Sequence, residues 1–271
     1  MTADGMTPGL PDNRFWDELL ASAAGCGVSP EIAEKATRDW PLWPLYSPLL
    51  RPVWTLAHLG QSLDGRIATE GGVSRYVTGS ENLDHLHRLR ALADAVIVGG
   101  ATAALDDPRL TTRRVRGANP VRVVLDPKRR LSEKLGIFQD GASPTLLVAA
   151  EATGPHGQAE VIAAPLADDG RLVPKGVVAA LRARGLNRLF VEGGGVTVSR
   201  WLGAGVLDHL QVTVAPMILG SGRPSLTLPP IEDLDLALRP ACQTYPLGAD
   251  VLFDFRLGEA RGDSEDRGDP R

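Results

Sequence analysis

Two carboxylates stand where buried strands are expected to end. Asp106 follows the apolar run at residues 95–98 after a short turn, and Glu192 directly follows the apolar run at residues 188–191. Ligands of open α/β sheets bind outside the carboxyl ends of the strands, so we expect both carboxylates at one binding edge. A carboxylate there can transfer a proton or hold a ligand hydroxyl. The pattern favours an enzyme site; the alternative is a capped loop with solvated charges.

Glycines accompany both carboxylates. Gly99 and Gly100 end the first run, and a glycine triplet at residues 193–195 follows Glu192. Glycine lets backbone approach a ligand closely, and a helix that begins beside it offers free N–H groups at a positive dipole end. This arrangement suits a phosphate group. The triplet is not the G-x-G-x-x-G fingerprint, so alone it is a weak signal of a nucleotide site.

Several segments recur in a fixed order along residues 51–257. They are SLDGR (62–66), SRYVTG (74–79), DDPRLT (106–111), VEGG (191–194) and APMILG (215–220). In this order they resemble the pyrimidine reductase domain of riboflavin biosynthesis, which has a dihydrofolate-reductase-like fold. The resemblance implies a three-layer α/β/α sandwich with a mostly parallel mixed sheet.

The resemblance also implies roles for individual residues. Asp106 and Glu192 match an aspartate beside the reacting carbon and a glutamate that contacts substrate, which makes them the expected catalytic pair. The implied cofactor-binding residues are Gly60, Tyr76, Thr102, Asp106, Gly193, Gly194, Gly195, Val196 and Thr197. The implied substrate-binding residues are Ser74, Arg90, Leu110, Arg113 and Glu192.

The activity that the resemblance implies is reduction by NADPH. The ribosyl side chain of an aminopyrimidine ribose phosphate becomes a ribityl chain, with the phosphorylated pyrimidine as the small-molecule partner. A preference for NADPH needs a basic group for the 2′-phosphate, and the sequence leaves five candidates unranked: Arg114, Arg116, Lys128, Arg129 and Arg130. Many relatives carry a zinc deaminase with H-x-E and P-C-x-x-C motifs. This chain has neither motif, so we expect it to reduce and not to deaminate.

Two alternatives stay open at this stage. A reductase of the same fold could act on a pterin, dihydrofolate or another fused pyrimidine, because the same stacking platform and cofactor cleft would serve. A non-catalytic relative could keep the nucleotide pocket without turnover. The intact pair Asp106 and Glu192 argues against this second alternative.

Composition narrows the function classes. The chain has 271 residues, 43% hydrophobic content and a net charge of −4, without a basic stripe, which argues against a nucleic-acid partner. No apolar run approaches a membrane span and the first residues contain no signal-peptide core, so we expect a cytoplasmic protein away from membranes. Cys26 and Cys242 are far apart, and His85 and His87 face different sides of a helix, so no metal site is expected.

Three regions differ in composition. Residues 1–50 form an N-terminal extension with helical patterns at 15–23 and 30–40 and a Trp- and Pro-rich segment at 40–48. We expect this last segment to pack on the core or on a partner subunit as a structural clasp. Residues 51–257 alternate strand-like and helix-like patterns and form the reductase domain. Residues 258–271 lack any apolar run and are predicted to be a disordered tail.

The pattern predicts about eight strands. The clearest are residues 53–59, 95–98, 121–125, 145–149, 188–191, 210–215 and 251–256, the last two antiparallel at the sheet edge. Helices are predicted at 82–93, after a Thr78-x-x-Glu81 capping box, at 174–184 and at 196–202, and Thr102 is expected to cap a short turn. In the family that the chain resembles, late strands build a homodimer contact.

Overall fold

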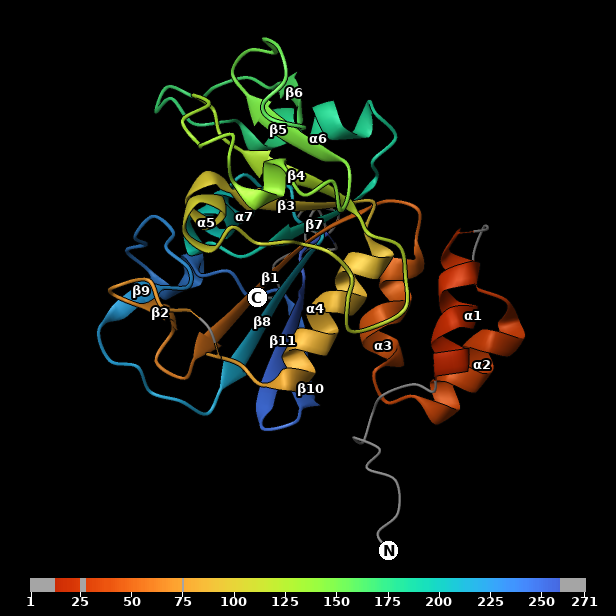
Figure 1. Ribbon diagram of the computed structural model, residues 1–271. Helices are drawn as coiled ribbons and strands as arrows, with labels where there is room; N and C mark the ends of the chain where they lie inside the picture. The colour runs from red at the N-terminus through yellow and green to blue at the C-terminus, as the bar shows by residue number, and fades with distance from the viewer. Residues whose placement is uncertain (1–12, 25–27, 75, 259–271) are drawn as a thin grey trace, which may run out of the picture.

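The computed structural model describes residues 13–24, 28–74 and 76–258. Its centre is a nine-stranded sheet in the order β10-β11-β8-β1-β7-β3-β4-β5-β6 (Figure 1). The strands are β1 Trp54–Ser62, β3 Ala95–Gly99, β4 Val121–Leu125, β5 Thr145–Ala149, β6 Glu160–Ala163, β7 Arg188–Glu192, β8 His209–Ala215, β10 Ala241–Leu247 and β11 Asp250–Arg256. A separate two-stranded sheet pairs β2 Arg66–Thr69 with β9 Gly222–Pro224. The tail expected to be disordered lies outside the described residues from position 259 on.

Neighbouring strands from β8 to β6 are all parallel. β11 pairs antiparallel with both β8 and β10. The predicted mostly parallel mixed sheet with late antiparallel strands is therefore confirmed, although it has nine strands rather than about eight. The sequence pattern missed β6 and β10, the two edge strands. β6 has only four residues with exposed ends, and β10 contains Pro246, which fits only an edge strand.

Helices cover both faces of the sheet and make the two outer layers of the sandwich. The side chains of β3 alternate, so that Val96 and Val98 face one hydrophobic cluster while Ala95 and Ile97 face the other. The helices are α1 Asn13–Ala24, α2 Pro30–Asp39, α3 Trp43–Tyr46, α4 Ser80–Leu92, α5 Gly100–Asp106, α6 Pro174–Arg182 and α7 Gly195–Gly203, with 3-10 turns η1 Ser47–Leu50, η2 Gly136–Phe138 and η3 Leu234–Leu236. α4 and the N-terminal helices pack on the first face, and α6 and α7 on the second.

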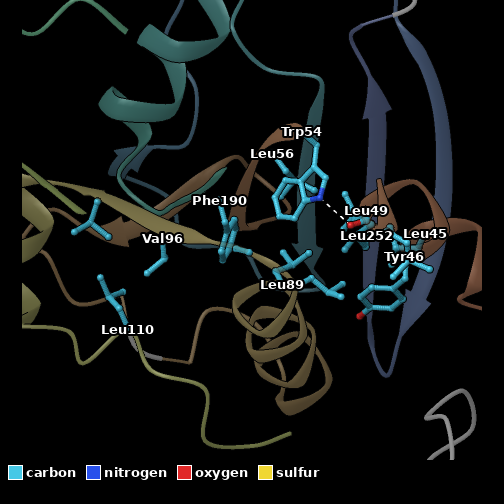
Figure 2. Close-up of a cluster of buried hydrophobic side chains, with 14 of the residues drawn as sticks. Leu45, Tyr46, Leu49, Trp54, Leu56, Leu89, Val96, Leu110, Phe190 and Leu252 are labelled. Atoms are coloured by element: carbon cyan, nitrogen blue, oxygen red, sulfur yellow. Dashed lines mark hydrogen bonds between the residues drawn. The ribbon is translucent and has the colours of Figure 1, made fainter. Parts of the chain in front are cut away.

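The N-terminal helices are part of the first cluster. Trp16, Trp40 and Tyr46 are each at most 2% exposed and pack together, with the rings of Trp40 and Tyr46 stacked at 5.0 Å. Figure 2 shows the cluster continuing from Tyr46 and Leu252 past Leu89 to Phe190 and Val96. The predicted clasp therefore packs on the core of its own chain.

The start of α4 differs from the sequence prediction. The predicted capping box does not form, because the N-cap is Gly79 and no side chain bonds the first helical N–H groups. The Gly79 N–H instead donates to Asp250 at 2.7 Å, and Thr78 Oγ1 accepts from Asn82 at 2.9 Å. A carboxylate from β11 thus replaces the local partner, and this contact between distant segments has no signature in the sequence. Within the described part of the chain, no helix is long and apolar enough to cross a membrane.

Candidate active site

A cavity of about 1190 Å³ opens at the carboxyl ends of the parallel strands β1, β3, β4 and β7. Its wall is completed by β2 and β9, which place Ala68 and Arg223 at the cavity. The volume exceeds the range of about 300–1,000 Å³ that is usual for drug-sized ligands. It has room for a dinucleotide and a second small molecule together.

Most of the site residues expected from the sequence line this cavity, and two do not. Arg90 and Arg113 are not lining residues; Arg90 bonds Glu192, and Arg113 bonds Thr111. The residues that line it are Gly60, Ser74, Tyr76, Thr102, Asp106, Leu110, Glu192, Gly193, Gly194, Gly195, Val196 and Thr197. These residues are far apart in the sequence, and the fold brings them together at the carboxyl ends of the parallel strands.

The two adjacent aspartates have separate surroundings. Asp106 is the last residue of α5, is exposed, and faces the cavity. Asp107 has a left-handed backbone with φ of 36°, and its carboxylate accepts the N–H groups of Gly136 at 2.7 Å and Ile137 at 3.0 Å. Asp107 therefore fixes the end of α5 to η2, while the Asp106 carboxylate stays available to a ligand.

Glu192 is held by a paired arginine. Arg90 Nε and Nη2 donate to its two carboxylate oxygens at 2.7 and 2.5 Å, and the side chains are 8% and 16% exposed. The third Arg90 donor, Nη1, bonds the Thr111 carbonyl at 3.0 Å. All three donor groups of Arg90 are engaged, so it positions Glu192 and the neighbouring loop instead of facing the cavity.

Arg113 joins the same cluster from the loop after α5. Its Nη1 donates to Thr111 Oγ1 at 2.7 Å, and its backbone N–H donates to His87 Nδ1 at 2.8 Å. Partial burial, together with the charges of Arg90 and Arg109, lowers the pKa of Arg113. Two guanidinium groups, of Arg90 and Arg113, act on one carboxylate and leave an excess of positive charge beside Glu192, which suits an anionic ligand group.

The helices α5 and α7 begin side by side at the cavity. Gly194, with φ of 71°, takes a backbone conformation that side chains rarely adopt, and a Cβ there would lie 3.0 Å from Thr102 Oγ1. Thr102 lies inside α5, whose N-cap is Gly99 without a side-chain bond, so the predicted cap role of Thr102 is wrong. The helix begins at Gly100, two residues before the threonine, and Gly99 is its N-cap. Thr102 is left free to face the cavity.

The SLDGR segment has a structural role beside the cavity. Asp64 accepts the Ser62 hydroxyl at 2.5 Å and the backbone N–H groups of Leu219 at 3.1 Å and Gly220 at 2.7 Å. These donors lower the pKa of Asp64 to about 2. These hydrogen bonds join the turn after β1 to the APMILG segment. This segment leads into β9, which forms part of the cavity wall.

The sequence-family model named RibD C-terminal domain matches residues 53–252. The chain belongs to the RibD C-terminal domain family. Residues 13–50, with the helices α1 to α3, lie outside the matched range.

Named relatives agree with this membership. The 2,5-diamino-6-ribosylamino-4(3H)-pyrimidinone 5′-phosphate reductase of Methanothermobacter thermautotrophicus is 35% identical over 221 residues, which cover 77% of this chain and 99% of that protein. The riboflavin biosynthesis protein RibD of Aquifex aeolicus is 31% identical over 197 residues, 72% of this chain and 54% of that protein. The chain thus spans nearly the whole Methanothermobacter reductase and about half of this RibD.

A solved structure supports the fold directly. The Thermotoga maritima diaminohydroxyphosphoribosylaminopyrimidine deaminase/5-amino-6-(5-phosphoribosylamino)uracil reductase superposes with a TM-score of 0.63 at 25% identity. The match covers 83% of this chain and 62% of that chain. The predicted α/β fold class is confirmed by this likeness and by the sheet order.

The structure ranks the basic residues that the sequence left unranked. Arg130 lines the cavity and Lys128 does not. Arg114 pairs with Asp84, Arg116 with Asp17, and Arg129 with the loop at Thr153. Three further arginines line the cavity: Arg171, Arg223 and Arg200, the last paired with Asp169. Arg171 lies in the loop before α6, where no motif marks it; only its position after β6, a strand the pattern also missed, could have shown it.

The cavity floor contains a neutral histidine. His58 on β1 is 2% exposed and its Nε2 lies 3.0 Å from Asn82 Oδ1 and 3.1 Å from Thr213 Oγ1. Burial lowers its pKa to about 4. Among the described residues, no group of three or more His, Cys, Asp or Glu side chains is arranged to hold a metal ion.

We expect the stability of the fold to decrease below neutral pH because three buried histidines are neutral when folded. Burial lowers the pKa of His58 and of His87 to about 4 and that of His85 well below 6.5. The unfolded chain binds more protons below pH 6.5, so the free energy of unfolding falls with pH, by about 1.4 kcal/mol per pH unit for each histidine. Urea unfolding at several pH values measures this.

The matched variant is His87→Gln, since the amide oxygen of glutamine can accept the Arg113 N–H that His87 Nδ1 now accepts. It is expected to reduce the slope by one histidine's share, about 1.4 kcal/mol per pH unit. A free energy of unfolding that stays constant between pH 6.5 and 4 in the unmodified protein would contradict the buried neutral state of these side chains.

Proposed function

We propose that this protein reduces the ribosyl side chain of a phosphorylated ribosylaminopyrimidine to a ribityl chain with NADPH. The observation that carries the proposal is one cavity in a RibD C-terminal domain that joins Asp106, Glu192 and the glycine-lined start of α7. The relative covered over 99% of its length is named a reductase of such a compound.

The cavity residues fit a nicotinamide dinucleotide. After the N-cap Gly194, the first residues of α7 put backbone N–H groups at the cavity, where a diphosphate gains from the positive end of the helix dipole. Thr102 and Thr197 add hydroxyl groups, and the exposed ring of Tyr76 offers a stacking surface. When bound, NADPH supplies the hydride for the reduction.

The substrate needs a proton at a defined place. When the ribose ring opens, the bond between the anomeric carbon and the ring oxygen breaks, the oxygen gains a proton, and a carbon–nitrogen double bond forms. Hydride addition to that carbon leaves the nitrogen with its electron pair restored. Asp106 carries out the proton transfer in this proposal, since its carboxylate faces the cavity and has no partner described in the structure.

Glu192 holds the substrate in this proposal. Paired with Arg90, its carboxylate accepts hydrogen bonds and does not donate them. It is therefore suited to the ribose hydroxyls. The positive charge of Arg90 and Arg113 beside it favours the substrate phosphate near the loop after α5.

Substrate class is tested by binding, without turnover. Calorimetric titration of the NADP⁺-loaded protein with the ribosylaminopyrimidine phosphate is expected to show saturable binding. The same titration with dihydrofolate is expected to show no saturable binding. Binding of dihydrofolate in preference would support the pterin alternative that the sequence left open. Absence of binding to either, and to NADPH alone, would contradict the proposed function.

Arg130 is proposed to receive the 2′-phosphate of NADPH. It lines the cavity at the end of β4, and no hydrogen bond or ion pair of its side chain is seen in the described ranges. Loss of a charge-assisted hydrogen bond is worth about 1.5 kcal/mol, so Arg130→Ala is expected to raise KM for NADPH about tenfold. KM for NADH should stay unchanged.

The adjacent Arg129 provides the matched control. Its guanidinium bonds the Thr153 hydroxyl at 2.9 Å and the Pro155 carbonyl at 2.7 Å, away from the cavity. Arg129→Ala is expected to leave both cofactor KM values unchanged. An equal rise in KM for NADPH and NADH in Arg130→Ala would show that this arginine does not read the 2′-phosphate.

We propose further that two copies form a homodimer through the face of β10 and β11 turned away from α4. β10 lies at the edge of the sheet. On that face Phe253 and Phe255 stack at 6.4 Å, and Val251 is 40% exposed. Sedimentation of the unmodified protein as a monomer, with no change on Val251→Glu, would oppose this assembly.

A further inference from the structure

The loop between α5 and β4, residues 107–120, has no regular secondary structure and carries Leu110 and Arg113. We propose that residues 13–24 and 28–50, the N-terminal brace, are a positioning element that holds this loop, the substrate loop, in its binding conformation. The proposal rests on the proposed function for the identity of the ligand. The brace lies outside the range of the family match, so the family resemblance assigns it nothing.

The brace contacts the substrate loop directly. Trp16 Nε1 donates to the Arg116 carbonyl at 2.8 Å, and the Arg116 guanidinium pairs with Asp17 at 2.5 Å. Trp16 is 2% exposed, so its N–H has exchanged water for this one acceptor. A buried tryptophan N–H bonded to a loop carbonyl fixes the loop to α1 at this point.

Gly117 shows how closely the loop approaches both helices. With φ of +145° it takes a conformation that suits glycine, and an added Cβ would lie 2.5 Å from Ala91 Cβ on α4 and 3.6 Å from Leu20 on α1. The loop is thus pressed between the brace and α4. Its backbone is also bonded to α4, where the Arg113 N–H donates to His87 Nδ1 at 2.8 Å.

The brace also fixes α4 itself. Tyr46 Oη lies 2.6 Å from His85 Nδ1, and the Arg88 guanidinium stands over the rings of Trp16 and Tyr46 at 5.8 and 5.9 Å. α4 carries Asn82 to the cavity and Arg90 to Glu192. The brace therefore holds the substrate loop in two ways: directly through Trp16, and indirectly through α4.

The loop transmits this position to the site through its first residues. Leu110 is 2% exposed, has φ of 53° and lines the cavity, and Figure 2 shows it beside Val96 at the end of the cluster that Tyr46 joins. The next carbonyl, of Thr111, accepts from Arg90. If the substrate loop moved away from α1, both Leu110 and the Arg90–Glu192 pair would shift with it. Long irregular loops open easily unless such contacts hold them.

The test is Trp16→Phe in the full-length protein, which removes the N–H donor and keeps an aromatic ring. Loss of one buried hydrogen bond predicts a rise of about fivefold in KM for the ribosylaminopyrimidine phosphate. kcat and KM for NADPH should change less than about twofold. Hydrogen exchange of the Arg113 amide should accelerate by a similar factor, since its acceptor His87 holds the loop.

Ser22→Ala is the matched control on α1, because the Ser22 hydroxyl bonds only the Glu18 carbonyl of its own helix. A second variant, Gly117→Ala, should raise the substrate KM more than Trp16→Phe does. Its control is Gly154→Ala, which imposes a positive φ where an added Cβ meets nothing within 4 Å.

Distinct results decide the proposal. Substrate KM and loop exchange that rise together in Trp16→Phe, with NADPH KM constant, support the brace. A lowered melting temperature with both values unchanged, or an equal rise in both KM values, overturns it. If the unmodified protein does not turn over the substrate, the proposed function fails, and the exchange of residues 111–118 still shows whether the brace holds the loop.

Discussion

Asp106→Asn is expected to lower kcat by about 100-fold, which corresponds to about 2.7 kcal/mol of transition-state stabilisation. Asparagine keeps the size and most of the hydrogen bonding of aspartate but cannot transfer the proton. KM for NADPH should change little, because the proposed phosphate contacts of the cofactor are at the start of α7 and at Arg130. Steady-state kinetics with both substrates varied measures these values.

Asp107→Asn is the control for this result. Its carboxylate bonds the backbone N–H groups of Gly136 and Ile137 and does not line the cavity. Asparagine keeps only one acceptor oxygen, so a small loss of stability with nearly unchanged kcat is expected. Equal losses of kcat in both variants, or normal turnover in Asp106→Asn, would end the assignment of proton transfer to Asp106.

Arg90→Met is expected to destabilise the fold by about 3 kcal/mol, because it leaves the Glu192 carboxylate without its partner. Both side chains of the pair are at most 16% exposed, so water replaces the lost contacts poorly. The Thr111 carbonyl also loses its donor. Chemical denaturation measures the stability, and KM for the ribosylaminopyrimidine phosphate should rise at the same time.

The double variant Arg90→Met with Glu192→Gln tests the pairing. Removing both charges should recover much of the stability lost in Arg90→Met alone, since no unpaired charge stays buried. Glu192→Gln alone should raise the substrate KM more than it lowers kcat, as expected of a residue that mainly holds substrate. Additive losses of stability in the double variant would contradict a coupled ion pair.

The binding edge, where the central parallel strands have their carboxyl ends, could be predicted from the sequence because these strands are buried and short. The apolar runs that end at Val98 and Val191 form β3 and β7, and the residues that follow them, Thr102, Asp106 and Glu192 among them, meet at the cavity. Parallel strands buried on both faces give continuous apolar runs, which a sequence pattern detects. The direction of the binding edge then follows from the parallel arrangement.

Contacts between segments far apart in the chain could not be predicted. The resemblance implies that Arg90 binds substrate, and the structure pairs it with Glu192, 102 positions later. The local capping box at α4 lost to Asp250, 171 positions from the glycine that it binds. Arg171 reaches the cavity from a loop without any motif. Each of these depends on how elements pack, and periodicity within one element carries no information about its partner.

The central claim is tested most directly by mixing the unmodified protein with NADPH and following the absorbance of the reduced nicotinamide. The account predicts that absorbance falls when the phosphorylated ribosylaminopyrimidine is added and that a ribityl product accumulates in equal amount. It predicts no fall with dihydrofolate or without a second substrate. NADPH oxidation with dihydrofolate alone, or none with any of these compounds, would contradict it.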